Sequence, residues 1–283
     1  MITTEQIKAL REQTGVSIMQ CKKALEEAEG NAEKALIILK KKGGEIAAKK
    51  SDREAHDGTV VVREGNGKAV ITVLHCETDF VAKNEDFVTA AHKLADIAFE
   101  QGEDAAREAA TEIVNAVVLK IGEKIELGSI ETIEGPVIGA YGHHTGRNAV
   151  VVVLSAGDST VAKDIAMHTA AMKPTYITRE EIPASAVDTA RELFAKEVAE
   201  SGKPEDIQKK MLQGKLDAYF QEQTLLDQPF FKNPDMTIGQ LLEKNGATIV
   251  SVTKKGARII HNVHHGYNSI LCFPSRIRRA LWV

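Results

Sequence analysis

The sequence predicts an α+β protein with an N-terminal three-helix domain, a duplicated α+β core and an antiparallel helical hairpin inserted in the second copy. Three observations predict this fold class. In residues 4–42, apolar residues recur at three- and four-residue steps. Residues 69–91 are similar to the segment 80 positions later. Residues 183–222 are rich in charged residues and have apolar residues at helical spacing. A chain of 283 residues is also long enough to bury a sizeable core.

Three short helices are expected in residues 4–42, each ending at a glycine. Ser17 and Asn31 are good N-cap residues for the second and third helices. An apolar stripe on each helix predicts the core of a small bundle, formed by Ile7, Leu10, Ile18, Cys21, Leu25, Ala28, Ala32, Leu36 and Leu39. Residues 45–57 are polar and weakly periodic, which predicts a linker that can be helical in part.

Two successive units of a β-hairpin and a helix are expected after this linker. Residues 59–76 hold two β-branched runs around turn residues, and the segment that follows returns to helical spacing. A second pair of apolar runs at 136–157 precedes another helical segment, which stops before Pro174. The predicted boundaries are 1–44 for the helical domain, 45–57 for the linker, 58–135 for the first repeat, 136–253 for the second and 254–283 for a basic tail.

The two units are interpreted as an internal duplication. A shift of 80 residues gives ten identities in the 23 positions from 69 to 91, including VAK and TAA in one register. Phe80 falls on Thr160 in this comparison. If both copies fold alike, the fold does not require a large ring at this junction, so Phe80 is a candidate for function instead of core packing.

A helical hairpin is expected at about residues 183–222. Its first stripe contains Val187, Ala190, Leu193, Phe194 and Val198, and the SGKP break at 201–204 separates it from a second, looser stripe. Two amphipathic helices joined by a short turn form an antiparallel hairpin. A loop, a short helix and a final strand are expected to follow it.

Composition argues against several classes of protein. The net charge of −4 gives no overall electrostatic case for nucleic-acid binding. Cys21, Cys76 and Cys272 lie far apart without a CxxC pair, so neither a disulfide framework nor a zinc site is indicated and a reducing compartment fits. Because no segment reaches the roughly 18 apolar residues of a membrane span, a cytoplasmic location is expected.

Motifs for covalent chemistry are weak, so no catalytic, cofactor-binding or metal-binding residue is expected. The stretch Gly65 to Lys68 continues into Ala69, where a phosphate loop needs Ser or Thr. His143 and His144 lack carboxylate or cysteine company and are weak as metal ligands.

A cysteine hydrolase built on Cys76 stays open as an alternative enzyme class, and it would need a lowered thiol pKa. The adjacent His75 cannot serve as its base through adjacency, because neighbours in a strand point to opposite faces.

Several separate motifs resemble the elongation factor Ts family, the bacterial guanine-nucleotide exchange factors of elongation factor Tu. They are LREQTGVSIMQCKKALEEAEGNAEKALIILKKKG, CETDFVAKNEDF, IAMHTAAMKP, SGKPEDIQKKM and DQPFFKNPDMTIGQLL, in this order along about residues 1–253. The resemblance implies a ubiquitin-associated-like helical domain at the N-terminus. It also implies a translation factor, not an enzyme, that accelerates GDP release by displacing magnesium-site elements and so allows GTP to rebind.

The resemblance also implies which residues contact the partner. Members of the family insert a TDFV turn beside the magnesium site, and this turn is Thr78, Asp79, Phe80 and Val81. Further contacts are implied for Arg11, Val16, Met19, Gln20 and His143. Met19 has the alternative of packing inside the bundle, and the turn GHHTGRN is spaced differently from the usual family form. The implied partner is elongation factor Tu, GDP-bound or nucleotide-free; no cofactor or membrane is implied, nucleic acid is not favoured and a homodimer stays open.

The resemblance stops at about residue 253. The last thirty residues contain six Lys or Arg and no Asp or Glu. One interpretation is a basic extension that binds RNA, which would make an RNA-binding module the alternative function. The other interpretation is an out-of-frame end, in which the coding sequence shifts after residue 253 and the tail is arbitrary.

Overall fold

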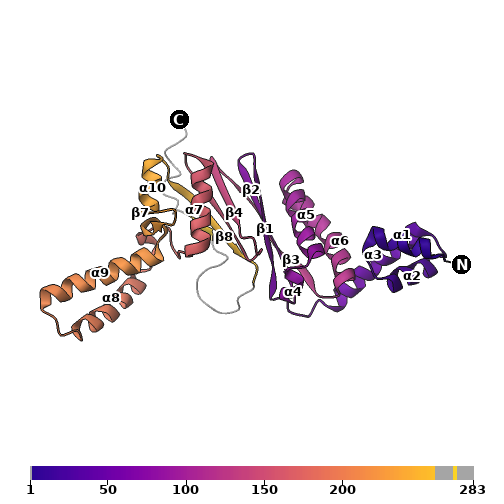
Figure 1. The fold of residues 1–283 in the computed structure, drawn as a ribbon, viewed down its shortest axis with the longest axis horizontal. Coiled ribbons are helices and arrows are strands. Elements are labelled where there is room, and N and C mark those ends of the chain that lie inside the picture. Colours follow the sequence, from indigo (N-terminus) through magenta and orange to yellow (C-terminus); the bar gives the residue numbers. More distant parts are fainter. Residues whose placement is uncertain (1, 259–269, 273–283) are drawn as a thin grey trace. The chain divides into compact units, whose positions relative to one another are not determined.

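The computed structural model describes residues 2–258 and 270–272 (Figure 1). The chain forms two compact units. The first holds the chain as far as Ile133, Gly142–Ala149 and a segment that begins at Lys255, while the second holds Glu134–Tyr141, Val150–Lys254 and the short strand at 270–272. Helices and sheets occur together along the chain, which confirms the predicted α+β class.

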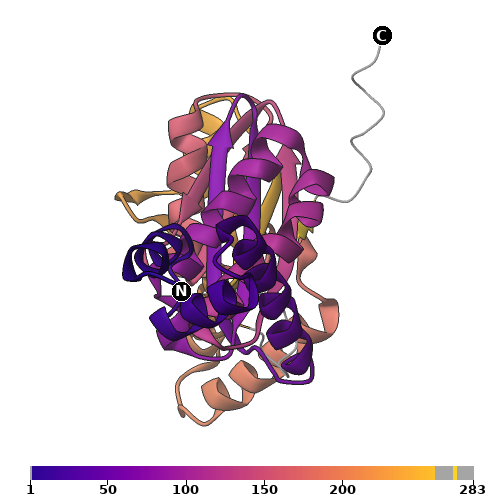
Figure 2. The same cartoon turned by 90° about the vertical axis from the view of Figure 1, so that its right-hand side faces the viewer.

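The N-terminal helices form a bundle, drawn in indigo in Figures 1 and 2. They are α1 (Thr4–Thr14), α2 (Ile18–Glu27) and α3 (Ala32–Lys49). Ser17 and Asn31 cap α2 and α3, as predicted. The bundle buries Leu10, Val16, Cys21, Ala24, Leu25, Ala28, Ala35 and Leu39 together with Leu119. Two residues of the predicted stripe are wrong: the side chain of Ile18 is 58% exposed at the first turn of α2, and Ala32 is exposed at the start of α3.

The prediction that the third helix ends at its glycines is also wrong, because α3 passes through Gly43 and Gly44 to Lys49. Along this extension α3 packs against α6 (Glu103–Ile121). A Cβ atom on Gly43 would lie 2.6 Å from the carbonyl oxygen of Asn115. Gly43 therefore permits two helices to approach closely, and it does not terminate one.

A three-stranded sheet forms the centre of the first unit, in the order β1 (Asp57–Gly65), β2 (Lys68–Cys76) and β3 (Ile125–Glu134). β1 and β2 form the predicted antiparallel hairpin. Its two-residue turn places Asn66 and Gly67 at φ 52° and 72°, which suits a tight hairpin turn.

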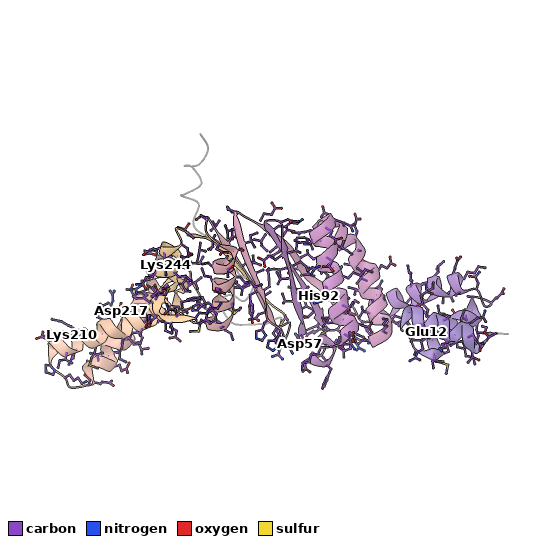
Figure 3. All side chains as sticks on the ribbon, turned by 45° about the horizontal axis from the view of Figure 1, so that its top comes forward. Glu12, Asp57, His92, Lys210, Asp217 and Lys244 are labelled. Atoms are coloured by element: carbon purple, nitrogen blue, oxygen red, sulfur yellow. The ribbon has the colours of Figure 1, made fainter. Side chains whose placement is uncertain are left out.

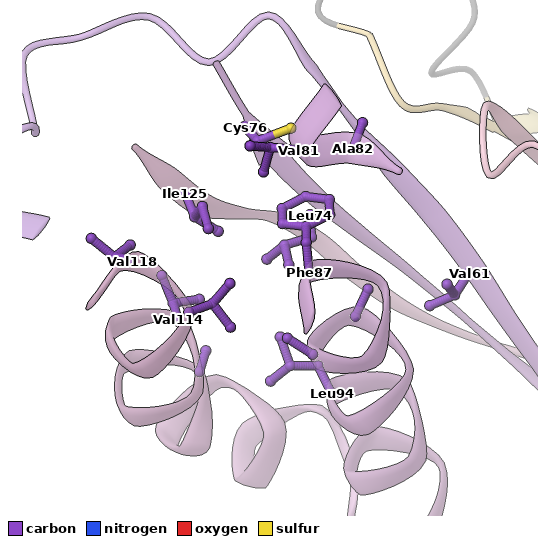
Figure 4. Packing of buried hydrophobic residues seen from close by; sticks show 14 of the residues in the cluster. Val61, Leu74, Cys76, Val81, Ala82, Phe87, Leu94, Val114, Val118 and Ile125 are labelled. Carbon is purple, nitrogen blue, oxygen red and sulfur yellow. The ribbon is translucent and has the colours of Figure 1, made fainter. Parts of the chain in front are cut away.

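Two helices follow β2 along the chain, the single turn α4 (Asp79–Ala82) and the longer α5 (Glu85–Gln101). Figure 4 shows how Phe87 and Leu94 of α5, Val114 of α6 and Leu74 of β2 meet in the core. The helical spacing expected after the hairpin is confirmed by α5, which buries an apolar face made of Phe87, Ala91, Leu94, Ala95 and Ala98.

A four-stranded sheet lies in the second part of the chain, in the order β4 (Val137–Gly142), β5 (Asn148–Leu154), β8 (Ile249–Gly256) and β9 (Ile270–Cys272). α7 (Ser159–Met172) and α10 (Ile238–Lys244) contribute to the core of the second unit, near the short pair β6 (Pro229–Phe230) and β7 (Asn233–Thr237). The N-caps of α4 and α7 are Thr78 and Asp158, which stand at the predicted 80-residue shift.

The predicted helical hairpin is α8 (Ala184–Ala199) and α9 (Glu205–Gln223), between the short turns η1 (Arg179–Glu181) and η2 (Leu225–Asp227). Charged side chains cover it, including Lys210 and Asp217 in Figure 3. The ion pair of Lys215 with Glu197, at 2.9 Å, joins its two helices. Leu193, predicted on the inner stripe, is 62% exposed.

The basic tail was predicted to begin at residue 254, but the strand β8 continues through Lys254 and Lys255 to Gly256. The RNA-binding and out-of-frame interpretations concern a tail that lies outside the described residues, apart from 254–258 and the backbone at 270–272. In the described ranges, no helix combines the length and apolar character needed to cross a membrane.

Candidate partner-binding site

α4 is a single helical turn that carries Phe80 between β2 and α5. Thr78 caps the turn, and its Oγ1 accepts a hydrogen bond from the Val81 amide at 3.4 Å. Asn84 then caps a new helix by accepting from the amides of Asp86 and Phe87. This second cap separates α4 from α5, whereas the matching segment of the second copy is one continuous helix, α7.

The two faces of α4 differ sharply in exposure. Val81 and Ala82 are buried in the core cluster around Phe87 (Figure 4). Phe80 is 81% exposed, more than any other large hydrophobic side chain in the described part of the chain. The turn is therefore anchored by its apolar inner face and presents an aromatic ring to solvent. Phe80 does not fill the core of its own unit.

The base of α4 is held by a turn that sequence reasoning missed. Glu123, just after α6, accepts hydrogen bonds from the Thr78 amide at 3.1 Å and from Thr78 Oγ1 at 2.9 Å. In the opposite direction, Glu77 accepts from the Lys124 amide at 2.6 Å and from Arg53. Burial would raise the pKa of Glu77, but these hydrogen bonds hold it below its usual value. No pattern in the sequence connects residues 77–78 with 123–124.

Asp79 is the charged residue of the turn. Its carboxylate accepts a hydrogen bond from Lys83 Nζ at 2.9 Å, one helical turn further on. This hydrogen bond lowers the pKa of Asp79, so the carboxylate is ionised at neutral pH. An exposed ion pair of this kind contributes little free energy. A cationic group of a binding partner could therefore replace Lys83 as the neighbour of Asp79.

The residues predicted in the bundle divide between surface and core. Arg11 is exposed and Met19 is 63% exposed, so Met19 takes the surface alternative. Gln20 is half-buried and its side chain accepts from Ser17 Oγ at 2.8 Å. Val16 is only 2% exposed and packs in the bundle core, so its side chain is not part of the surface.

His143 lies half-buried in the turn between β4 and β5. Its Nδ1 contacts Thr145 Oγ1 at 2.7 Å, and its ring centroid lies 4.3 Å from that of His144. The turn is attached to β1, because the Val60 amide donates to the Gly146 carbonyl at 2.8 Å. The bundle, α4 and the His143 turn thus all belong to the first unit.

Cys76 does not have the chemistry of a nucleophile. Its thiol is buried and donates to the Thr78 carbonyl at 3.2 Å. Burial, reinforced by the charges of Asp57 and Glu123, raises the pKa of Cys76 to about 12. The reactive thiolate is therefore scarce at neutral pH, which argues against the cysteine-hydrolase alternative. The described residues also contain no cluster of three or more His, Cys, Asp or Glu side chains that could hold a metal ion.

The family model described as elongation factor TS matches residues 77–256, and so extends through β8. Proteins named elongation factor Ts are similar over most of the chain. That of Kineococcus radiotolerans is 38% identical over 266 residues, covering 89% of this chain and 97% of its own. That of Marinobacter nauticus is 41% identical and covers 88% of each chain, and that of Hahella chejuensis is 39% identical and covers 89% of this chain and 91% of its own.

Proposed function

The chain belongs to the elongation factor Ts family of translation elongation factors, and from that premise we propose that it binds elongation factor Tu and accelerates the release of GDP. The observation that carries the proposal is the exposed ring of Phe80 on an anchored helical turn. Such a ring has little use within the folded chain. Burying it in a partner pocket would contribute about 1.5 to 3 kcal/mol, the size of a strong contact in an interface.

Nucleotide exchange of this kind needs no covalent chemistry from the chain. If the factor binds nucleotide-free elongation factor Tu more tightly than the GDP-bound form, thermodynamic linkage requires that the factor weaken GDP binding by the same ratio. No catalytic residue is needed for this exchange. GTP then rebinds once GDP has left.

The turn of Thr78, Asp79, Phe80 and Val81 is the proposed wedge. Phe80 would displace partner elements beside the magnesium ion, and loss of that ion would weaken the hold on the β-phosphate of GDP. The ionised carboxylate of Asp79 would compete for polar contacts near the same site. Arg11, Met19, Gln20 and His143 would add contacts from the same unit.

We propose that the two β-hairpin and helix units arose by duplication, supported by the N-caps at Thr78 and Asp158. We also propose a ubiquitin-associated-like N-terminal bundle, and a cytoplasmic protein with elongation factor Tu as its partner. A homodimer is compatible with this proposal.

The proposal is tested by release of fluorescent GDP from elongation factor Tu in excess unlabelled GDP. Substoichiometric amounts of this chain should raise the release rate in proportion to its concentration and return unmodified GDP. A paired titration should show that the factor weakens GDP binding to elongation factor Tu by a certain ratio. The factor itself should bind nucleotide-free elongation factor Tu more tightly than the GDP-bound form by the same ratio. A release rate unchanged by stoichiometric factor would refute the function.

A further inference from the structure

We propose that Glu123 is a positioning residue for the wedge: its carboxylate fixes Thr78, and with it the direction of Phe80, before the partner binds. The inference rests on the proposed function, because it assigns a role within that same site. It concerns a residue outside the TDFV motif, in the turn that follows α6.

The contacts of Glu123 have the geometry of a two-point clamp. One carboxylate oxygen accepts from the Thr78 amide at 3.1 Å and the other from Thr78 Oγ1 at 2.9 Å. Thr78 Oγ1 in turn accepts from the Val81 amide. Hydrogen bonds to a charged group are stronger than neutral ones, so the carboxylate fixes both the backbone and the side chain of the residue that starts α4.

A second pair of contacts makes the clamp reciprocal. Glu77 accepts from the Lys124 amide at 2.6 Å, so each segment captures a backbone amide of the other with a carboxylate. Lys124 Nζ also donates to the carbonyl of Arg53 at 2.7 Å, and Arg53 pairs with Glu77. Glu77 and Thr78 are thus tied to the turn after α6 at several points.

The second copy of the unit provides an internal comparison. At its matching junction, Asp158 caps its own helix by accepting from the Thr160 amide at 2.8 Å. A local cap is therefore enough to start a helix at this place in the fold. The hydrogen bonds from Glu123, in a distant segment, are made in the copy that carries the exposed Phe80.

The clamp would reduce the cost of binding. α4 is one turn long, and helices so short are not stable by themselves. A turn that had to become ordered during binding would lose part of the free energy gained by burying Phe80. Holding Thr78 in advance keeps the ring in its binding position.

The test measures GDP release from elongation factor Tu with the full chain carrying Glu123→Ala or Glu123→Gln. Glutamine offers one acceptor oxygen to two donors, so it should retain part of the activity. We expect Glu123→Ala to lower kcat/KM for exchange about tenfold, with Glu123→Gln in between. Glu126→Ala is the matched control, because it removes a neighbouring carboxylate that pairs with Lys124 at 2.9 Å and leaves α4 untouched. That control should stay within about twofold of wild type.

Two further readouts separate positioning from general damage to the fold. In a Phe80→Ala background, Glu123→Ala should cause a smaller loss than in wild type, because the ring whose position it fixes is absent. Amide hydrogen exchange should accelerate in residues 77–83 of Glu123→Ala but not in α5. Additive losses in the double variant, unchanged exchange in residues 77–83, or wild-type activity of Glu123→Ala would each overturn the inference. If Phe80→Ala lowers activity while Glu123→Ala does not, the clamp fails and the proposed function stands. If the wild type itself does not accelerate release, the proposed function fails.

Discussion

At the level of single residues, the buried environment of His168 favours the neutral form of its imidazole ring. It is fully buried in α7. Its Nε2 lies 3.0 Å from Gln228 Oε1, and its Nδ1 accepts from the Phe231 amide at 3.4 Å. Nδ1 can accept that hydrogen bond only while the ring is neutral. Burial lowers the pKa of His168, partly opposed by the hydrogen bond to Gln228.

A pH dependence follows from this shift. The unfolded chain takes up the proton near the ordinary pKa of 6.5, whereas the folded chain does so only at lower pH. The contribution of His168 to stability should be complete above that ordinary value and decline as the pH falls from it through the folded pKa. The free energy of unfolding, measured in urea between pH 7.5 and 5, should fall less steeply for His168→Gln than for wild type. Equal slopes would contradict this account.

Sequence reasoning predicted some residues well because the chain contains its own comparison. The replacement of Phe80 by Thr160 indicated that the fold does not need the ring, and Phe80 is indeed exposed. Glu123 could not be predicted in the same way. Its contact with Thr78 joins positions 45 residues apart, and neither periodicity nor composition records such a contact. The contact of Val16 was implied by the resemblance, but its side chain packs in the bundle core.

At the scale of secondary structure, boundaries were harder to predict than the elements themselves. The bundle, the hairpin of β1 and β2, and the hairpin of α8 and α9 follow the predicted patterns. The end of α3 does not, because a glycine can terminate a helix or admit a neighbouring one, and only the packing partner decides between the two. For Gly43 that partner is Asn115 of α6.

Two glycine substitutions test this distinction. Gly43→Ala should destabilise the packing of α3 on α6 by about 1 to 3 kcal/mol, because the added methyl group would overlap the Asn115 carbonyl. Gly214→Ala, in the interior of α9, is the matched control. A Cβ there meets nothing within 4 Å, so helix propensity should stabilise α9 by about 0.5 to 1 kcal/mol.

Amide hydrogen exchange of peptides from α3 and α9 measures the two effects separately. We expect faster exchange in α3 of Gly43→Ala and slower exchange in α9 of Gly214→Ala. Unaltered protection of α3 in Gly43→Ala would show that the two helices tolerate a larger separation.

At the scale of the whole molecule, the residues proposed to contact the partner all lie in the first unit. The sheet and its helices bury Val81 and Ala82, and the turn after α6 holds Thr78. These contacts hold the junction between β2 and α4 in place, with the ring of Phe80 exposed. No nucleophile, cofactor or metal site is required for a function that depends on differential binding.

The most direct test of this account is the rate of GDP release from elongation factor Tu with wild type, Phe80→Ala and Thr160→Ala. The two variants remove exposed side chains from matching positions of the two copies. The contact energy expected for one buried ring corresponds to a loss of about 10- to 100-fold in kcat/KM for Phe80→Ala, with Thr160→Ala close to wild type. Full activity of Phe80→Ala, or equal losses in both variants, would show that the exposed ring does not drive exchange.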